Sequence, residues 1–215
     1  MPFPLPRLSL SEFTAGIAPL SPESLGEAAV AALYAYYQEL ARWNERLNLI
    51  GPGTAGEILA RHFGESLAAL PLLPPGARVG LDLGSGAGFP GLVLAAARPG
   101  LEMTLVEARE RKWAFLLSAA RRASLSCRCL NVRVQLPLPP GLPESLDVIT
   151  SRALRLDPET WSVLGRRLGP EGRVLLWVGE NDPDLPPDLV SCGGVKLAGS
   201  ERRRILALRS VSSGP

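Results

Sequence analysis

The sequence predicts an α/β protein with a mostly parallel, doubly wound sheet that is preceded by helices. From residue 78 onwards, short apolar runs alternate with segments of helical periodicity, which is the order of elements in a parallel sheet. The first run leads into a glycine-rich turn, Gly84-Ser85-Gly86-Ala87-Gly88, which a helix follows. Such a turn brings backbone N–H groups close to a ligand at the carboxyl edge of the sheet.

Composition limits the classes of protein that fit. The chain has 215 residues, of which 46% are hydrophobic and 20% charged, enough for one sizeable α/β core. It has neither a run of 18 apolar residues nor the apolar core of a signal peptide, so we expect a cytoplasmic protein without a membrane segment. Three cysteines and one histidine, His62, form no metal-ligand pattern. The net charge of +2, with arginines in pairs, permits binding to nucleic acid without requiring it.

The N-terminal part is expected to be mainly helical. Residues 1–20 are rich in proline and are predicted to be irregular. Apolar residues at three- and four-residue spacing predict a helix that begins after Ser21 as its N-cap and ends near Arg46. A second helix is predicted over residues 57–70. Residues 21–75 therefore form a helical extension that we expect to be one compact unit with a core of residues 76–215.

The core is predicted to hold alternating strands and helices. Its helices are expected to begin near Pro90 and to cover residues 110–124 and 157–168. Two late strands, split by Gly199-Ser200, are expected to close the sheet as a hairpin. The predicted strands are residues 78–83, 103–107, 132–134, 146–150, 174–178, 195–197 and 205–209.

The spacing within the glycine turn narrows the class of ligand. A dinucleotide-binding Gly-x-Gly-x-x-Gly pattern that starts at Gly84 would need glycine where the chain has Phe89, which disfavours a nicotinamide oxidoreductase. The turn instead reads Asp82-x-Gly84-x-Gly86-x-Gly88 and resembles motif I of class I methyltransferases, which bind S-adenosylmethionine. The carboxylate of Asp82 suits a ligand that carries an ammonium and a sulfonium group. A tight turn that binds no ligand is the alternative reading.

An acidic residue at the end of the second predicted strand supports a nucleoside ligand. Glu107 lies 23 residues after Gly84. A carboxylate at this position can accept hydrogen bonds from ribose hydroxyls. The alternative for Glu107 is a solvated acid at the start of the next helix, where the helix dipole favours negative charge.

Several segments match one known family in the same order along the chain. The chain resembles the bacterial 16S ribosomal RNA guanine-N(7) methyltransferases, also called glucose-inhibited division protein B, over residues 34–209. The Phe89-Pro90 pair and the segment Thr150-Ser151-Arg152-Ala153 are its most specific parts. The matching segments are Trp43-Asn44-Glu45-Arg46-Leu47-Asn48-Leu49, Arg61-His62-Phe63-Gly64-Glu65-Ser66-Leu67, residues 71–79, residues 84–91, Leu105-Val106-Glu107-Ala108-Arg109 with Arg111-Lys112, and residues 147–153.

This resemblance implies a Rossmann-like class I methyltransferase fold with a seven-stranded sheet and a late antiparallel strand. It also implies a monomer that uses S-adenosylmethionine, needs no metal and acts on 16S rRNA or the small ribosomal subunit. Arg152 is then placed at the mouth of the site, beside both cofactor and RNA, whereas a salt bridge at the strand end is its structural alternative. His62 is a candidate RNA contact, although a lone histidine on such a helix is more often packed or exposed. The implied cofactor-binding residues are Gly84, Ser85, Gly86, Phe89, Glu107 and Arg152.

The chain also departs from the family pattern. Glu65 stands where the family usually has aspartate, and Val178-Gly179 stands where it usually has Lys-Gly. The acidic Arg-Ala-Glu element after the third strand is replaced by a stretch that begins at Gln135, and Gly80 suggests a shift in the first strand. Two alternatives therefore stay open: a methyltransferase for another RNA site or a small molecule, and an RNA-binding protein that retains the fold without turnover.

The chemistry that the family carries out requires no acid–base pair. The N7 atom of guanine presents an available lone pair in the major-groove edge. Attack on a sulfonium methyl group removes no proton from that nitrogen. We therefore assign no catalytic residue from the sequence. The aromatic residues Tyr36, Tyr37 and Trp43 recur at helical spacing, which places them mainly in the core rather than on an RNA-stacking surface.

Overall fold

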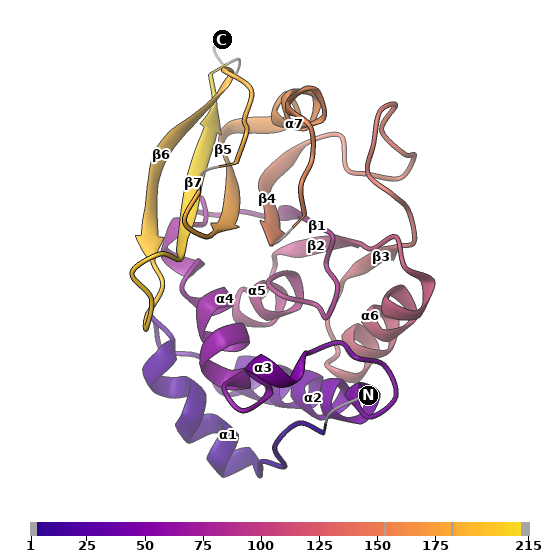
Figure 1. Cartoon of the computed structure of the whole chain (residues 1–215), viewed down its shortest axis with the longest axis vertical. Helices are drawn as coiled ribbons and strands as arrows, with labels where there is room; N and C mark the ends of the chain where they lie inside the picture. Colours follow the sequence, from indigo (N-terminus) through magenta and orange to yellow (C-terminus); the bar gives the residue numbers. More distant parts are fainter. Residues whose placement is uncertain (1–3, 153, 182, 212–215) are drawn as a thin grey trace.

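A seven-stranded sheet forms the centre of the computed structural model, which describes residues 4–152, 154–181 and 183–211 (Figure 1). The strand order is β3-β2-β1-β4-β5-β7-β6. Strands β1 to β5 pair in parallel, and β7 runs antiparallel to both of its neighbours. This confirms the predicted parallel sheet with a late antiparallel strand. The strands are β1 Val79–Leu83, β2 Glu102–Val106, β3 Arg128–Leu130, β4 Leu146–Arg152, β5 Leu168–Val178, β6 Leu189–Lys196 and β7 Arg204–Ser210.

Helices surround the sheet and precede it. Seven α-helices are supplemented by 3₁₀ turns at Ala18–Leu20 and Leu70–Leu72 and by a π-helical segment, Leu59–Gly64, among the described residues. None of the helices in the described ranges has the length and apolar character needed to cross a membrane. The α-helices are α1 Leu10–Ile17, α2 Glu27–Asn44, α3 Pro52–Ala55, α4 Glu65–Leu67, α5 Gly91–Ala97, α6 Glu110–Arg122 and α7 Pro158–Gly165.

The N-terminal segment differs from the irregular structure expected for residues 1–20. Helix α1 begins with a capping box, in which the Ser9 hydroxyl accepts the Glu12 N–H and the Glu12 carboxylate accepts the Ser9 N–H. Phe13 and Ile17, one turn apart, are buried and anchor the helix. Pro4 and Pro6 precede this cap, whereas Pro19 lies in the 3₁₀ turn Ala18–Leu20 that follows the helix. Residues 1–3 lie outside the described residues.

Helix α2 begins later than predicted. Its N-cap is Gly26, and its first residue is Glu27. Ser21, the predicted cap, instead donates its hydroxyl to the Glu23 carbonyl at 2.7 Å. A serine and proline pair is equally compatible with a turn, which explains the error.

The third strand also differs from its predicted position. β3 is formed by Arg128–Leu130, which pairs with β2, rather than by residues 132–134. Val132 and Val134 show the alternation of a half-buried strand because they pack against the apolar core on one side of the sheet. Period-two burial in a loop looks the same as strand periodicity in the sequence.

Gly80 lies inside a regular strand, so the suggested shift in the first strand is wrong. The pairing of β1 with β2 is continuous from Val79 to Leu83. A Cβ at Gly80 would collide with the Met103 sulfur on the neighbouring strand. Glycine is therefore required because Met103 fills the space where a side chain would lie.

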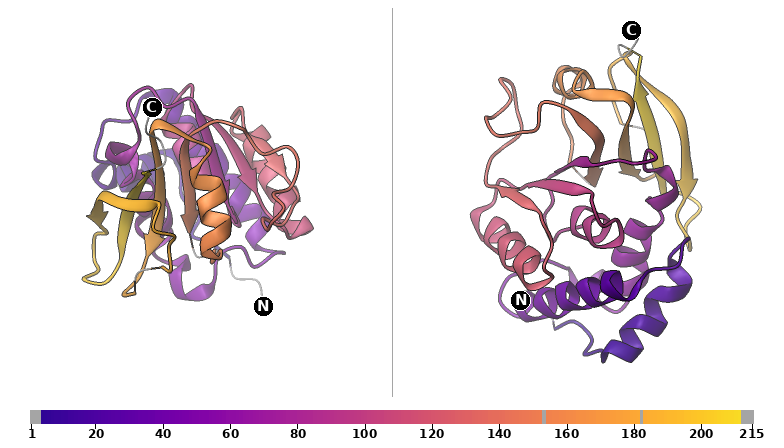
Figure 2. Two further views of the ribbon diagram at one scale, coloured as in Figure 1. Left: turned by 90° about the horizontal axis from the view of Figure 1, so that it is seen from above. Right: turned by 180° about the vertical axis from the view of Figure 1, so that it is seen from behind.

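The sheet is covered unequally on its two faces. One face carries α5, α6 and the N-terminal helices, whose core includes Tyr36 and Tyr37, so the prediction that these rings are buried is confirmed. The other face carries α7 and the loop of residues 131–143, which contains no helix. Seen from above, α7 stands on one side of the sheet, opposite the purple and pink helices (Figure 2). The carboxyl ends of β1, β2 and β4 point toward the N-terminal helices and leave a cleft between the two.

Candidate functional site

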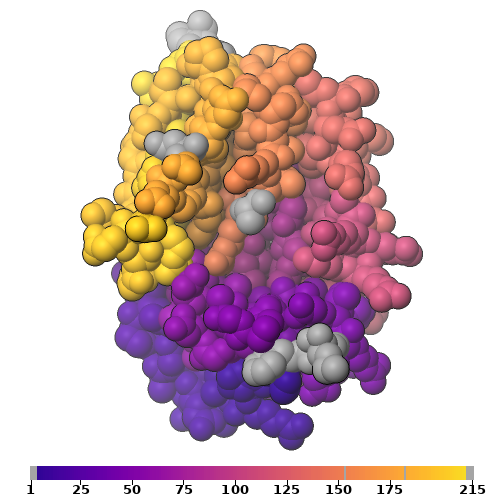
Figure 3. Space-filling model, in the orientation of Figure 1, coloured from indigo at the N-terminus to yellow at the C-terminus, as the bar shows by residue number. Residues whose placement is uncertain are grey.

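The cleft at the carboxyl edge of the sheet has a volume of about 650 Å³. Its lining comes from the glycine turn after β1, residues 106–109 at the end of β2, residues 132–135 after β3, residues 154–157 after β4, residues 49–50 after α2, and the single residues His62, Lys112 and Arg152. The space-filling view shows a hollow where the purple helices meet the orange and pink segments of the sheet (Figure 3). Ligands bind at this edge in open parallel sheets.

The glycine turn forms the floor of the cleft. Gly84, Gly86 and Gly88 have φ angles of +70°, +55° and +95°, in the region that L-residues rarely adopt. Helix α2 supports the turn through a hydrogen bond that the Tyr36 hydroxyl donates to the Ala87 carbonyl at 2.5 Å. A side chain at Gly88 would clash with the neighbouring helix residue and with this hydroxyl. The backbone of the turn is therefore exposed to the cleft and held in a fixed shape.

Two polar residues of the motif support the turn from within the protein. Asp82 is fully buried, and its Oδ1 atom accepts the Thr150 hydroxyl at 2.7 Å. Burial raises the pKa of Asp82 to about 6, against the opposing effect of its hydrogen bonds. Ser85 is also buried and donates its hydroxyl to the Asp82 carbonyl and its N–H to the Val106 carbonyl. Neither side chain is among those that line the cleft, and both act on the turn from beneath.

Glu107 stands at the end of β2 and lines the cleft, as the sequence predicts. Its two carboxylate oxygens accept the N–H groups of Gly86 at 3.0 Å and Arg109 at 2.8 Å. The side chain is 7% exposed, and it links the glycine turn to the start of α6. Because a carboxylate oxygen has two lone pairs, Glu107 retains acceptor capacity for a hydroxyl in the cleft.

Arg152, at the end of β4, lines the cleft and forms an ion pair as well. Its Nη2 atom donates to Glu65 Oε2 at 2.8 Å and to the Arg61 carbonyl at 2.9 Å. Burial lowers the pKa of Arg152 to about 10, with a further effect from the nearby Arg61 charge. The salt bridge expected as the structural alternative is therefore present, and the same side chain also faces the cleft. The Ala153 that follows in the motif lies outside the described residues.

His62 and Phe89 form one side of the cleft together. His62 lies in the π-helical segment, and such segments are frequent at functional sites. Its ring centroid is 5.1 Å from that of Phe89, and its Nε2 atom is 3.0 Å from the Thr54 hydroxyl. Burial lowers the pKa of His62 to about 3, with additional effects from the Arg152 and Arg61 charges. His62 is therefore neutral at physiological pH and cannot serve as a cation for RNA.

Reasoning from the sequence missed the apolar wall formed by the loop after α2. The Asn44 side chain accepts the N–H groups of Leu49 at 2.9 Å and Ile50 at 2.8 Å, which folds this loop against the cleft. Asn44 is fully buried. The motif that begins at Trp43 contains this asparagine, and a buried amide within a conspicuous motif was the signal for such a loop.

The residues that line the cleft are of the kinds that S-adenosylmethionine requires. The glycines leave the backbone of the turn open to close contact with a ligand, and the Glu107 carboxylate suits ribose hydroxyls. Apolar side chains at Val106, Val132 and Leu156 provide surfaces for a flat adenine ring. Polar acceptors and apolar walls of these kinds match the ligand, so the residues present fit the cofactor.

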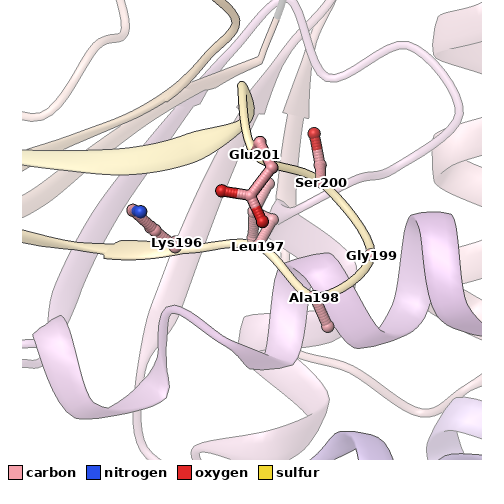
Figure 4. Close-up of a pocket in the computed structure, with 6 residues that line it drawn as sticks. All are labelled: Lys196, Leu197, Ala198, Gly199, Ser200 and Glu201. Atoms are coloured by element: carbon pink, nitrogen blue, oxygen red, sulfur yellow. The ribbon is translucent and has the colours of Figure 1, made fainter.

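A second hollow, of about 490 Å³, lies at the turn between β6 and β7. All of its lining, residues 196–201, comes from that single turn (Figure 4). It has no polar groups converging from different elements, so we do not regard it as a functional site. No group of three His, Cys, Asp or Glu side chains within the described ranges is arranged to hold a metal ion.

Comparison with known proteins identifies the family. The family model described as rRNA small subunit methyltransferase G matches residues 29–184. A protein named ribosomal RNA small subunit methyltransferase G from Anaeromyxobacter sp. (strain Fw109-5) is 38% identical over 211 residues, which are 94% of this chain and 93% of that protein. A protein of the same name from Desulfotalea psychrophila is 44% identical over 126 residues, and the match spans 57% of each chain.

Solved structures show the fold. A mutant of MtNAS in complex with S-adenosylmethionine has a TM-score of 0.57 at 14% identity, covering 94% of this chain and 77% of the other. The mixed sheet and its flanking helices are those of a class I methyltransferase. With this fold, and with a family model that matches most of its length, the chain belongs to the rRNA small subunit methyltransferase G family of S-adenosylmethionine-dependent methyltransferases.

Proposed function

We propose that this S-adenosylmethionine-dependent methyltransferase transfers a methyl group to the N7 atom of a guanine in 16S rRNA. The match of residues 29–184 to the family carries this proposal. The cleft at the carboxyl ends of β1, β2 and β4 supports it, because that edge is where a parallel sheet holds its ligands. The substrate sets the expected location, the cytoplasm, and the enzyme is expected to act as a monomer.

The cofactor would be held by the turn and by the acid after β2. Gly84, Gly86 and Phe89 line the cleft and would contact the cofactor, and Glu107 would accept hydrogen bonds from its ribose hydroxyls. Ser85 belongs to this site only indirectly, because its hydroxyl and its N–H are already engaged within the protein. When bound, S-adenosylmethionine supplies an activated methyl group on a sulfonium centre.

The target base would lie on the opposite side of the cleft, between the apolar loop and the end of β4. Leu49, Ile50 and Leu154 line this part and would exclude water from the reacting atoms. Arg152 and the neutral His62 stand beside it and offer hydrogen bonds to the base edge. Since N7 already carries its lone pair, these residues only need to orient the base. Alignment of this kind supplies roughly 7–11 kcal/mol of the barrier reduction in favourable cases.

Two departures from the family pattern, at Gln135 and Val178, are the reason to consider a second candidate, an RNA-binding protein without turnover. Gln135 lines the cleft as a neutral amide in the segment where the family has an acid. Val178 removes the lysine charge, but its register partner across the sheet is Arg204, which restores a positive charge at the same edge. The compensation by Arg204 makes us prefer the active enzyme.

Three measurements test the proposal. Isothermal titration calorimetry with purified protein should show binding of S-adenosylmethionine. Methyl transfer should be assayed with deproteinised rRNA, small ribosomal subunits and a metabolite pool as separate acceptors, and only the ribosomal substrates should be labelled. Mapping of 7-methylguanosine in rRNA from cells with and without the gene should then reveal one missing modification. RNA binding without cofactor affinity would support the inactive RNA-binding protein instead.

A further inference from the structure

Three arginines from distant parts of the chain converge on the buried carboxylate of Glu65. Arg61 Nε lies 3.2 Å from Glu65 Oε1, and Arg152 Nη2 lies 2.8 Å from Oε2. Arg203, in the connection between β6 and β7, forms an ion pair with Oε1 through its Nη1 atom. We name these four residues the Glu65 cluster. The Glu65 side chain is only 5% exposed, so this carboxylate is fully committed to the protein.

The cluster carries more positive than negative charge. Glu65 supplies one negative charge against three guanidinium groups. Within the described residues, the one further carboxylate paired with any of them is Glu57, 3.9 Å from Arg61 and itself 66% exposed. The pKa values of Arg152 and Arg203 both lie below the usual value for arginine, because burial and then the Arg61 charge disfavour further positive charge there. The protein thus holds guanidinium groups together against their mutual repulsion.

The arginines remain accessible at the rim of the cleft. The side chains of Arg61, Arg152 and Arg203 are 34%, 21% and 23% exposed. Arg152 lines the cleft itself, whereas Arg203 lies outside it, at the turn that reaches from the sheet toward the N-terminal helices (Figure 1). An anion bound across these groups would therefore sit directly beside a base held in the cleft.

The chemistry of the cluster suits a phosphate group. Each guanidinium has five N–H donors in a fixed planar fork, and such forks match phosphate oxygens. Glu65 engages only one nitrogen of each arginine in the ion pairs above, which leaves further donors for a ligand. We propose that the Glu65 cluster is a binding site for a backbone phosphate of the substrate RNA, next to the methylated nucleotide. This inference rests on the proposed function, because it assigns the anion to the RNA substrate.

The test compares two arginines: Arg203, directly before β7, and Arg209, near the end of β7. Arg203→Gln removes a charge from the cluster. Arg209→Gln is the matched control, because Arg209 is exposed and pairs in register with Val190 at the opposite edge of the sheet. Affinity for 16S rRNA transcribed in vitro would be measured by filter binding between 50 and 200 mM salt, which are ordinary conditions for such titrations. Binding of S-adenosylmethionine to each variant would be measured in parallel by calorimetry.

Arg203→Gln should weaken RNA binding about tenfold, as expected for one charge-assisted hydrogen bond. The slope of log affinity against log salt should also become shallower by roughly 0.7, the value for one contact to a single strand. Cofactor affinity should stay at the wild-type value, and Arg209→Gln should change neither quantity by more than twofold. Arg61→Gln provides a second variant if Arg203→Gln lowers the thermal midpoint, and it should show the same change in slope.

The phosphate site would be overturned if the slope of log affinity against log salt were the same for the cluster variants, the Arg209→Gln control and the wild type. That failure is distinct from failure of the proposed function. If the wild type binds rRNA and the cluster variants reduce the slope, the site stands even if 7-methylguanosine mapping finds no product. If the mapping succeeds and the slopes are equal, the enzyme assignment stands and the phosphate site is wrong.

Discussion

The hydrogen bond between Tyr36 and the glycine turn allows a sharp test of how α2 supports the cofactor site. Tyr36→Phe keeps the ring, which packs 5.4 Å from both Phe63 and Phe89, and removes only the hydroxyl that donates to Ala87. The Tyr36 side chain is fully buried, so the Ala87 carbonyl loses a partner that water cannot easily replace. Loss of a partner to a buried polar group costs about 1–3 kcal/mol. For a chain of this size each kcal/mol lowers Tm by about 2–4 °C.

The same substitution should also weaken the cofactor site, because the carbonyl belongs to the turn that forms its floor. Burial, followed by the charge of Asp82, raises the pKa of Tyr36 well above its ordinary value, so the hydroxyl remains a donor throughout the working pH range. We expect the Kd for S-adenosylmethionine to rise about three- to tenfold, as part of the same 1–3 kcal/mol is lost from the shape of the turn.

Tyr34→Phe is the matched control for this experiment. The Tyr34 hydroxyl donates to the Leu8 carbonyl at 2.9 Å, at the N-terminal segment rather than at the turn. It should lower the thermal midpoint without changing cofactor affinity. Differential scanning calorimetry and isothermal titration calorimetry measure the two quantities. If Tyr36→Phe and Tyr34→Phe bind S-adenosylmethionine equally well, the argument that α2 supports the turn is refuted.

The other predictions concern four residues of the cleft and its supports. Gly84→Asp should abolish S-adenosylmethionine binding in calorimetry, because its φ of +70° strains any side chain and the carboxylate would enter the cleft; binding at the wild-type Kd would contradict this. Glu107→Gln should weaken cofactor binding at least about tenfold, because the new NH₂ group would face a backbone N–H where a carboxylate oxygen now accepts it. An unchanged Kd would remove Glu107 from the site. The folded-state pKa of Asp82, about 6, lies above its unfolded value near 3.8, so ionisation destabilises the fold as pH rises from 4 to 6. In urea unfolding, Asp82→Asn should therefore gain about 2.4 kcal/mol relative to the wild type between pH 4 and pH 7, and a pH-independent difference would count against it. Glu65→Gln should lower the free energy of unfolding by about 3–5 kcal/mol, because it leaves buried guanidinium groups without a counter-charge, and a loss below about 1 kcal/mol would show that solvent screens them.

The sequence was sufficient to predict the parallel sheet and the location of the glycine turn, because both depend on local signals. Buried strands leave continuous apolar runs, and positive φ angles require glycine at Gly84 and Gly86. Glu107 was placed at the cleft for the same reason, since the distance along the chain from the turn fixes its position at the end of the next strand.

What the sequence could not show depends on contacts between distant segments. The burial of Asp82 beneath the turn depends on the packing of α5 over β1, which brings Gly91 against its carboxylate. The π-helical segment around His62 has no signature that separates it from an α-helix. Arg203 was one member of a basic run, and nothing in its neighbours indicates that it meets Glu65 across the fold.

Arg203 follows the other members of the Glu65 cluster in the chain, so it is the last of them to be synthesised. A chain is synthesised from its N-terminus, and its parts fold as they emerge. The glycine turn, Glu107 and the helices that support them are present before the β6–β7 connection exists. Until that connection is added, the Glu65 carboxylate can pair with Arg61 and Arg152 but lacks its third arginine, Arg203. A nascent chain can therefore form the cleft before the Glu65 cluster is complete, and the proposed phosphate site would exist only after the last hairpin has been added.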